Sequence, residues 1–123
     1  MAKRRIALEL GQGTSIRSMD YTAAAVRAVK DALWRNSLSA ADAFGFDRSA
    51  MLVDVEIGVQ NPDAVDVAQV AAVFPYGVVT VLPKLGGLDV PKHGKSGHLV
   101  VAVAAVSVHF DMEKVYSEGG SNT

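Results

Sequence analysis

The chain has 123 residues, of which 50% are hydrophobic and 20% charged, and it contains no cysteine. Its formal net charge of −1 gives no overall attraction to nucleic acid or to an anionic membrane. The missing cysteine excludes a disulfide scaffold and Cys-ligated metal centres. The length fits one domain, which we expect over residues 1–112, with a polar, disordered tail over residues 113–123.

The first part of the chain predicts a strand and then a helix. Residues 4–10 alternate between apolar and polar side chains, as in a half-buried strand, and Gly11-Gln12-Gly13-Thr14-Ser15 is expected to end it. Asp20 or Thr22 can cap the helix that follows. Over residues 23–36 apolar side chains recur with helical spacing, and their small alanines allow the helix to lie close to a sheet.

The middle of the chain predicts a second strand, a second helix and a third strand. Residues 51–59 alternate strictly, and Pro62 ends that strand because proline has no N–H for a sheet. Apolar residues at helical spacing predict a helix over residues 67–74. Residues 78–82 are expected to form a strand, and the Gly, Pro and Lys residues over 84–97 predict a loop.

The last strand, over residues 99–108, is apolar on both faces. Its two sets of side chains are Val100, Ala102, Ala104 and Val106 on one face and Leu99, Val101 and Val103 on the other. A strand that is apolar on both faces is buried on both. The order β-α-β-α-β-β predicts an α+β fold in which right-handed crossovers put both helices on one face of a mixed sheet.

The other face of that sheet then lacks cover within the chain. Leaving it in water would cost several kcal/mol, at ~25 cal/mol per Å² of apolar surface. We therefore expect a homo-oligomer, and we favour a trimer that closes three sheets into a barrel. The longest apolar stretch, residues 99–110, is far below the ~20 residues of a membrane-spanning helix, so we expect no membrane anchor. The absence of cysteine fits a cytoplasmic location, which we also expect.

Two glycine-rich segments are candidate ligand-binding loops. Gly11, Gln12 and Gly13 follow a strand, where glycine lets the backbone approach a ligand, although a plain strand-ending turn explains them equally well. Gly86 and Gly87 follow Lys84, so flexible backbone and positive charge converge as an anion site requires. With Arg27 from the first helix, these residues make up the predicted ligand-binding set.

Glu9 and Glu56 are the candidate acid–base residues. Strand alternation puts both on polar faces that we expect to meet other subunits, where loss of water suits a carboxyl group to proton transfer. Ion pairs across the interface explain them as well. His93 and His98 have no carboxylate at metal-ligand spacing, so we expect neither a metal nor another cofactor. Their loop is either a lid over an anion or a solvated hairpin.

Several motifs resemble a known family. The segments Glu9-Leu10-Gly11-Gln12-Gly13, Asp20-Tyr21-Thr22, Pro75-Tyr76-Gly77 and Gly86-Gly87-Leu88 resemble the Lin0512 family, small bacterial proteins of unassigned function. The order of elements is similar to that of the YjgF and chorismate-mutase-like trimers, which implies ligand sites between subunits. The glycine motifs are also similar to repeat signatures of the ring-opening amidohydrolases that act on cyanuric acid and barbiturate.

Those amidohydrolases use Ser–Lys pairs, and this chain departs from their pattern. Leu85 and Leu8 stand where the serine and the lysine would be expected, and Lys84 is one position away. We therefore expect first a homotrimeric protein that binds a small polar or anionic metabolite between subunits. The alternatives are a cyclic amide or imide hydrolase with Glu9 or Glu56 as base, and a structural or regulatory trimer without a ligand.

Overall fold

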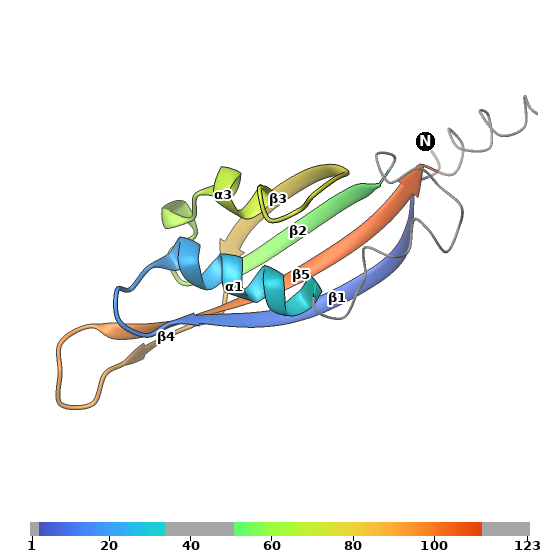
Figure 1. Ribbon diagram of the computed structural model, residues 1–123. Coiled ribbons are helices and arrows are strands. Elements are labelled where there is room, and N and C mark those ends of the chain that lie inside the picture. Colours follow the sequence, from blue (N-terminus) through green and yellow to red (C-terminus); the bar gives the residue numbers. More distant parts are fainter. Residues whose placement is uncertain (1–2, 34–50, 112–123) are drawn as a thin grey trace, which may run out of the picture.

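The computed structural model describes residues 3–33 and 51–111. In this part of the chain a five-stranded sheet is accompanied by two α-helices and a short 3-10 helix, η3 (Figure 1). The elements are β1 (Lys3–Ser15), α1 (Tyr21–Leu33), β2 (Leu52–Val59), η3 (Pro62–Ala64), α3 (Val67–Ala71), β3 (Val78–Leu85), β4 (Leu88–Pro91) and β5 (His98–Asp111). The predicted tail and the predicted last residues of the first helix, 34–36, lie outside the described residues.

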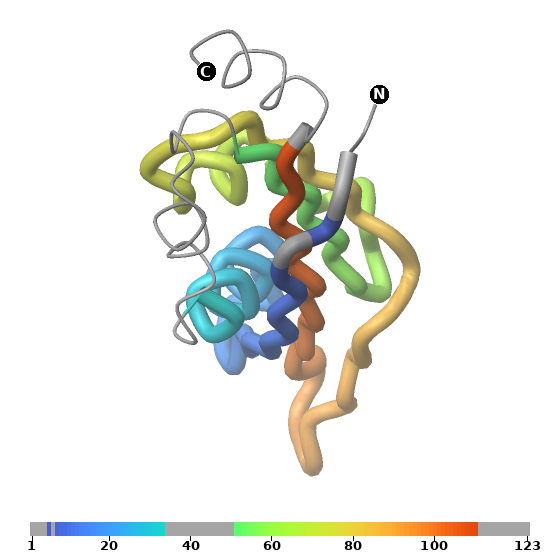
Figure 2. The backbone as a smooth tube through the Cα atoms, turned by 90° about the vertical axis from the view of Figure 1, so that its right-hand side faces the viewer, coloured from blue at the N-terminus to red at the C-terminus, as the bar shows by residue number. Residues whose placement is uncertain are grey.

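The long strand β5 is the centre of the sheet. It pairs antiparallel with β1 on one side and with β2 on the other, and β3 lies parallel to β2 at the edge, giving the order β1-β5-β2-β3. Both helices lie on the same face, and the tube view shows them to one side of β5 and β1 (Figure 2). The mixed sheet and its two helices confirm the predicted α+β class. Within one chain the sheet is open, and a barrel of three copies stays a prediction.

The core lies between the helices and alternate residues of the strands. From β5 the buried side chains run from Val100 through every second residue to Phe110, and β2 adds Val53, Val55, Ile57 and Val59. The facing side of α1 is built from small residues, namely Ala24, Ala25, Ala28, Val29 and Ala32. Small side chains on a helix let its axis approach the sheet, as the alanine pattern had indicated.

Side-chain hydrogen bonds fix where the helices begin. Asp20 caps α1, because its Oδ1 accepts a bond of 2.9 Å from the backbone N–H of Ala23. Thr22, the other candidate cap, joins the two helical segments instead. Its hydroxyl donates to the Ala64 carbonyl at 3.2 Å and accepts from the Asp66 N–H at 2.9 Å. Since Asp66 in turn caps α3, this contact holds α3 beside α1 over one face of the sheet.

The prediction that the first glycine segment ends β1 is wrong, because the strand continues through it to Ser15. The glycines face α1 at very close range. A Cβ added to Gly11 would lie 2.3 Å from the Ala28 carbonyl oxygen, and one added to Gly13 would lie 2.4 Å from that of Ala24. Glycine is needed here for close helix–strand packing and not for a ligand loop.

The prediction of a continuous loop over residues 84–97 is also wrong. β3 extends to Leu85, and β4 pairs with β5 where β2 has ended, with Leu88 opposite Val101. Between β3 and β4 the chain crosses the end of β2. A Cβ on Gly87 would lie 2.2 Å from the Val101 carbonyl oxygen, and Gly87 has a φ of +60°, so the crossing requires glycine.

Two charged side chains of α1 cover the free edge of β1. Asp31 Oδ2 accepts a bond of 3.0 Å from the Gln12 N–H, and Arg27 Nη1 donates to the Thr14 carbonyl at 2.6 Å. An uncovered edge strand offers these same groups to another chain. The contacts therefore disfavour extension of the sheet along this part of β1.

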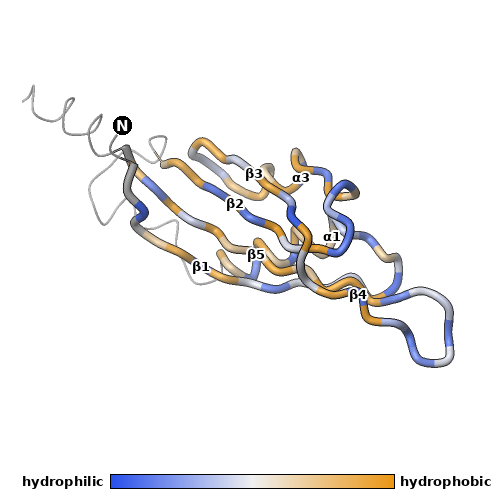
Figure 3. The backbone as a smooth tube through the Cα atoms, turned by 180° about the vertical axis from the view of Figure 1, so that it is seen from behind, coloured by the Kyte–Doolittle hydropathy of each residue, from blue (hydrophilic) through white to orange (hydrophobic). Residues whose placement is uncertain are grey.

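The face of the sheet opposite the helices, called the open face below, has no cover among the described residues. Leu10 is 61% exposed and Val103, on the central strand, is 44% exposed. The other large apolar side chains exposed on this face are Leu8, Val78, Leu82, Leu88 and Val90. Seen from behind, strands β1, β5, β2 and β3 lie in front of the helices and carry apolar segments (Figure 3).

Replacing Gly13 by alanine tests the packing of β1 against α1. The new methyl group would meet backbone atoms of α1 at 2.4 Å, and backbone cannot move as a side-chain tip can. We expect the free energy of unfolding to fall by roughly 2–3 kcal/mol, measured by urea denaturation. Thr14→Ala, next to it with its exposed side chain on the open face, should change stability much less. Equal, small effects would contradict the packing argument.

Candidate functional site

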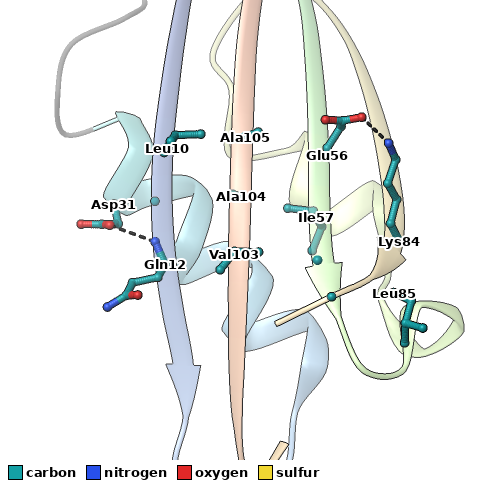
Figure 4. Close-up of a pocket in the computed structure, with 13 residues that line it drawn as sticks. Leu10, Gln12, Asp31, Glu56, Ile57, Lys84, Leu85, Val103, Ala104 and Ala105 are labelled. Atoms are coloured by element: carbon teal, nitrogen blue, oxygen red, sulfur yellow. Dashed lines mark hydrogen bonds and ion pairs between the residues drawn. The ribbon is translucent and has the colours of Figure 1, made fainter. Parts of the chain in front are cut away.

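A cavity of about 630 Å³ lies on the open face, and we call it the central groove. Four strands supply its lining: β1 through Leu10 and Gln12, β5 through Val103 and Ala105, and both β2 and β3. In Figure 4 these residues lie across the sheet with α1 behind them. The groove therefore occupies the surface that residues 3–33 and 51–111 leave uncovered.

An ion pair between two described strands lies along one side of the groove. Lys84 Nζ of β3 contacts Glu56 Oε1 of β2, and the two side chains are 49% and 52% exposed (Figure 4). Adjacent strands bring them together, since Gly58 is the register partner of Lys84. An ammonium group offers three donors and a carboxylate only acceptors. Lys84 and Glu56 therefore present a donor and an acceptor side by side.

The floor of the groove is apolar, and small residues on the strands give the groove its depth. Gly58 and Ala105 leave space on β2 and β5, and a Cβ on Gly58 would lie 2.8 Å from a methyl carbon of Val103. Leu10 stands at the opposite side from the ion pair (Figure 4). A cavity with an apolar floor and a few polar groups at its rim is the usual form of a small-molecule site.

The structure brings part of the predicted ligand-binding set together. Gly11, Gln12, Lys84 and Gly86 all line the central groove, and Glu56 joins them. Gly13 is buried against α1 and does not line the groove. Gly87 lies in the chain crossing beside β5, and its carbonyl accepts a bond from Gln60 Nε2 at 3.3 Å.

The backbone of the predicted anion loop is largely engaged within the chain. The N–H of Gly86 donates to the Val59 carbonyl at 2.9 Å, and its carbonyl accepts from Gln60 Nε2 at 3.1 Å. A backbone anion site needs N–H groups directed at the ligand. The backbone of Gly86 therefore stabilises the segment that crosses the end of β2. The polar group that this segment offers to a ligand is the ammonium of Lys84.

Glu9 and Glu56 lie on opposite faces of the sheet, so the prediction that both carboxylates lie on one polar face is wrong. Glu9 is the register partner of Val106, which is buried beneath the helices, whereas Glu56 is opposite Ala105 on the open face. The reason is the alternation of β1. Because Gly11 and Gly13 must face α1, the side of Glu9 is the helix side, and Leu8 and Leu10 point away from the core.

Arg27 does not reach the central groove. It lines a separate cavity at the end of β1, together with Thr14, Ser15, Ile16, Arg17 and Ser18. Within one chain Arg27 and Lys84 do not share a cavity, because Arg27 extends past the edge of β1 to the Thr14 carbonyl while Lys84 lies on the far side of the sheet. A site that combines them between subunits stays a prediction.

A polar cluster that the sequence did not indicate joins α1 to the β4–β5 hairpin. The Tyr21 hydroxyl donates to Asp89 Oδ2 at 2.5 Å, and His98 Nε2 lies 3.1 Å from that hydroxyl and 3.3 Å from the same carboxylate oxygen. These residues are up to 77 positions apart in sequence, so only tertiary structure unites them. The hydrogen bond to Asp89, with burial and the carboxylate charge, raises the pKa of Tyr21 to about 12.

The loop before His98 forms the exposed tip of the β4–β5 hairpin. A solvated hairpin is one of the two arrangements that the sequence predicts for this loop. The N–H of Lys92 donates to the Gly97 carbonyl at 3.2 Å, which closes the turn between β4 and β5. In the described part of the chain no three His, Cys, Asp or Glu side chains gather as a metal site. Nor does either described helix have the length and apolar character to cross a membrane.

The Tyr21 contact predicts a loss of stability at alkaline pH. A phenol whose pKa is about 12 in the folded state and ~10 unfolded keeps its proton longer when folded, so its contribution is complete below pH ~10 and disappears as the pH rises toward 12. We expect Tyr21→Phe to lower stability by roughly 1 kcal/mol at neutral pH and to flatten the alkaline decline. Parallel stability curves for the variant and the natural chain between pH 9 and pH 12, measured by urea denaturation, would contradict this.

Comparison with known proteins identifies a family but no activity. No curated protein matches the chain. Among solved structures, an FtsZ-like protein of unknown function from Nostoc punctiforme is 30% identical, covers 90% of this chain with 98% of its own, and superposes with a TM-score of 0.81. The family model described as a conserved hypothetical protein, Lin0512, matches residues 5–108. The chain therefore belongs to the Lin0512 family, as its glycine, tyrosine and proline motifs indicated.

Proposed function

We propose that this protein is a homo-oligomer that binds a small polar metabolite in the central groove, where subunits meet. The observation that carries the proposal is the apolar open face, on which Leu10, Leu82 and Val103 are each more than 40% exposed. Apolar surface of this kind on a small domain marks an interaction site. Covering it with a partner would also enclose the groove and exclude water from its ion pair.

A second copy of the chain is the partner that the charges of this face favour. On β2 and β3 the charged groups of this face lie beside opposite or polar partners: Lys84 contacts Glu56, and Asp54 Oδ2 is 3.6 Å from His109 Nδ1. Two identical faces with uncompensated charge would repel each other, whereas a compensated apolar face can pack on copies of itself. The similar order of elements in the YjgF and chorismate-mutase-like trimers supports three copies over two.

A charge introduced at the centre of the open face should break the assembly. Val103 on β5 and Val67 on α3 are 44% and 45% exposed, so they form a matched pair on opposite sides of the molecule. We expect Val103→Lys to reduce the mass in solution to that of a monomer, because a lysine cannot be buried between apolar faces without a partner. Val67→Lys should leave the mass unchanged. Sedimentation equilibrium at micromolar concentration distinguishes these outcomes.

Equal masses for both variants would contradict the proposed interface. A far-UV circular dichroism spectrum for each variant establishes that the sheet is intact. A natural chain that is already monomeric at this concentration would remove the assembly from the proposal altogether.

The polar groups of the groove favour a ligand with both a donor and an acceptor. A simple anion would meet one cation, Lys84, and two carboxylates, Glu56 and Asp31. In an amide or imide, the carbonyl oxygen can accept a hydrogen bond from the ammonium of Lys84, and the adjacent N–H can donate one to the carboxylate of Glu56. The apolar floor suits the flat carbon skeleton of a small cyclic compound.

The second candidate function is hydrolysis of such a cyclic amide or imide. It is favoured by one observation: Glu56, unlike Glu9, lies on the groove beside a lysine. In this proposal Glu56 acts as the base that activates water and Lys84 polarises the carbonyl. The chain has Leu85 where the similar amidohydrolases are expected to have serine, so water and not a serine hydroxyl would attack.

Thermal-shift measurements test binding and hydrolysis together. A cyclic amide or imide that binds should stabilise the protein by roughly 2.7 kcal/mol at a hundredfold excess over its Kd, and Lys84→Ala should remove the shift. Lys92→Ala, on the hairpin outside the groove, is the control.

Turnover of a cyclic amide or imide that vanishes in Glu56→Gln supports the hydrolase. No shift with cyclic amides or with carboxylates, from an intact oligomer, would contradict both and favour an assembly without a ligand.

A further inference from the structure

We propose that the cavity at the end of β1 is a second binding site, which takes a phosphate group between Arg17 and Arg27. The cavity has a volume of about 420 Å³ and is lined by Thr14, Ser15, Ile16, Arg17, Ser18 and Arg27. It shares no lining residue with the central groove, so the proposal does not depend on the function proposed for that groove.

Among the described residues, this lining carries two positive charges and no carboxylate. Arg17 is exposed and has neither a hydrogen bond nor an ion pair with any described residue. The nearest acidic residues along the chain are engaged elsewhere, since Asp20 caps α1 and Asp31 binds the Gln12 N–H. A dianionic phosphate would therefore meet two guanidinium groups without a competing acid in the lining.

Arg27 is held in position before any ligand arrives. Its Nη1 donates to the Thr14 carbonyl at 2.6 Å, so the side chain is fixed across the edge of β1. A guanidinium group has five N–H donors, and this contact uses one. The remaining donors are available on a side chain that has already lost most of its conformational freedom, which reduces the entropic cost of binding.

Hydroxyl groups complete the polar lining. Ser15 Oγ is almost fully buried and accepts a bond of 3.1 Å from the Asp20 N–H, which holds the turn that carries Arg17 and Ser18. Ser18 Oγ lies 3.4 Å from Ser15 Oγ, and the Ser18 side chain is exposed. A hydroxyl donor beside two guanidinium groups is a common arrangement for phosphate oxygens, whereas a carboxylate needs only one guanidinium.

Isothermal titration calorimetry of the full chain with inorganic phosphate, with glycerol phosphate and with acetate tests this site. We expect both phosphates to bind, more weakly as NaCl is raised, and acetate to bind at least tenfold more weakly. Arg17→Gln should raise the Kd for phosphate at least tenfold without affecting the fold, because Arg17 is exposed and forms no hydrogen bond or ion pair with the described residues. Lys30→Gln removes the same charge from an exposed position on α1 outside the cavity and should leave the Kd within twofold.

Three results would overturn the proposal. The first is no heat of binding with either phosphate. The second is a Kd that Arg17→Gln leaves unchanged, and the third is an equal loss in Lys30→Gln, which would mean attraction by general charge. Binding of glycerol phosphate but not of inorganic phosphate would support the site and identify a phosphate ester as its ligand.

Discussion

The central strand β5 is apolar on both faces, and the described part of the chain supplies helices for only one of them. The exposed apolar surface of the open face follows from this imbalance. The side chains from Val100 to Phe110 that face α1 and α3 are buried, while Val103 on the other face is 44% exposed. Apolar surface is removed from water whenever geometry allows, because its burial is the main favourable term in folding and association. The open face is therefore where we infer that another subunit packs.

Close packing between α1 and β1 sets which side of each strand becomes the open face. Gly11 and Gly13 bring the backbone of β1 against Ala24 and Ala28, so the odd-numbered residues of β1 from Ala7 to Ser15 face the helix. Strand alternation then assigns Leu8, Leu10 and Gln12 to the other face, where Gln12 meets the central groove. Had the glycines formed a ligand loop, the strand would have ended early and Glu9 could have joined Glu56. A constraint of backbone packing thus decides which carboxylate belongs to the site.

The elements with clean periodicity could be predicted, and those that depend on close backbone contact could not. The strict alternation over residues 51–59 and the apolar run over 99–108 correspond to β2 and β5. These two patterns also predicted that one face of the sheet, the open face, lacks cover by helices. Glycine carries no periodic signal, so the roles of Gly13 under α1 and of Gly87 in the crossing over β2 could not be read from sequence. Nor could the contact between Tyr21 and Asp89, which depends on the β4–β5 hairpin returning to α1.

The most direct test of the account is the solvent exposure of the open-face methyl groups in the intact protein. A soluble paramagnetic probe, added to a sample with labelled Val and Leu methyl groups, broadens the signals of accessible side chains. Our account predicts that Val103 and Leu82 are protected while Val67, as exposed as Val103 in the single chain, is broadened. Broadening of all three to the same extent would mean that water covers the open face, and the assembly with its enclosed groove would be contradicted.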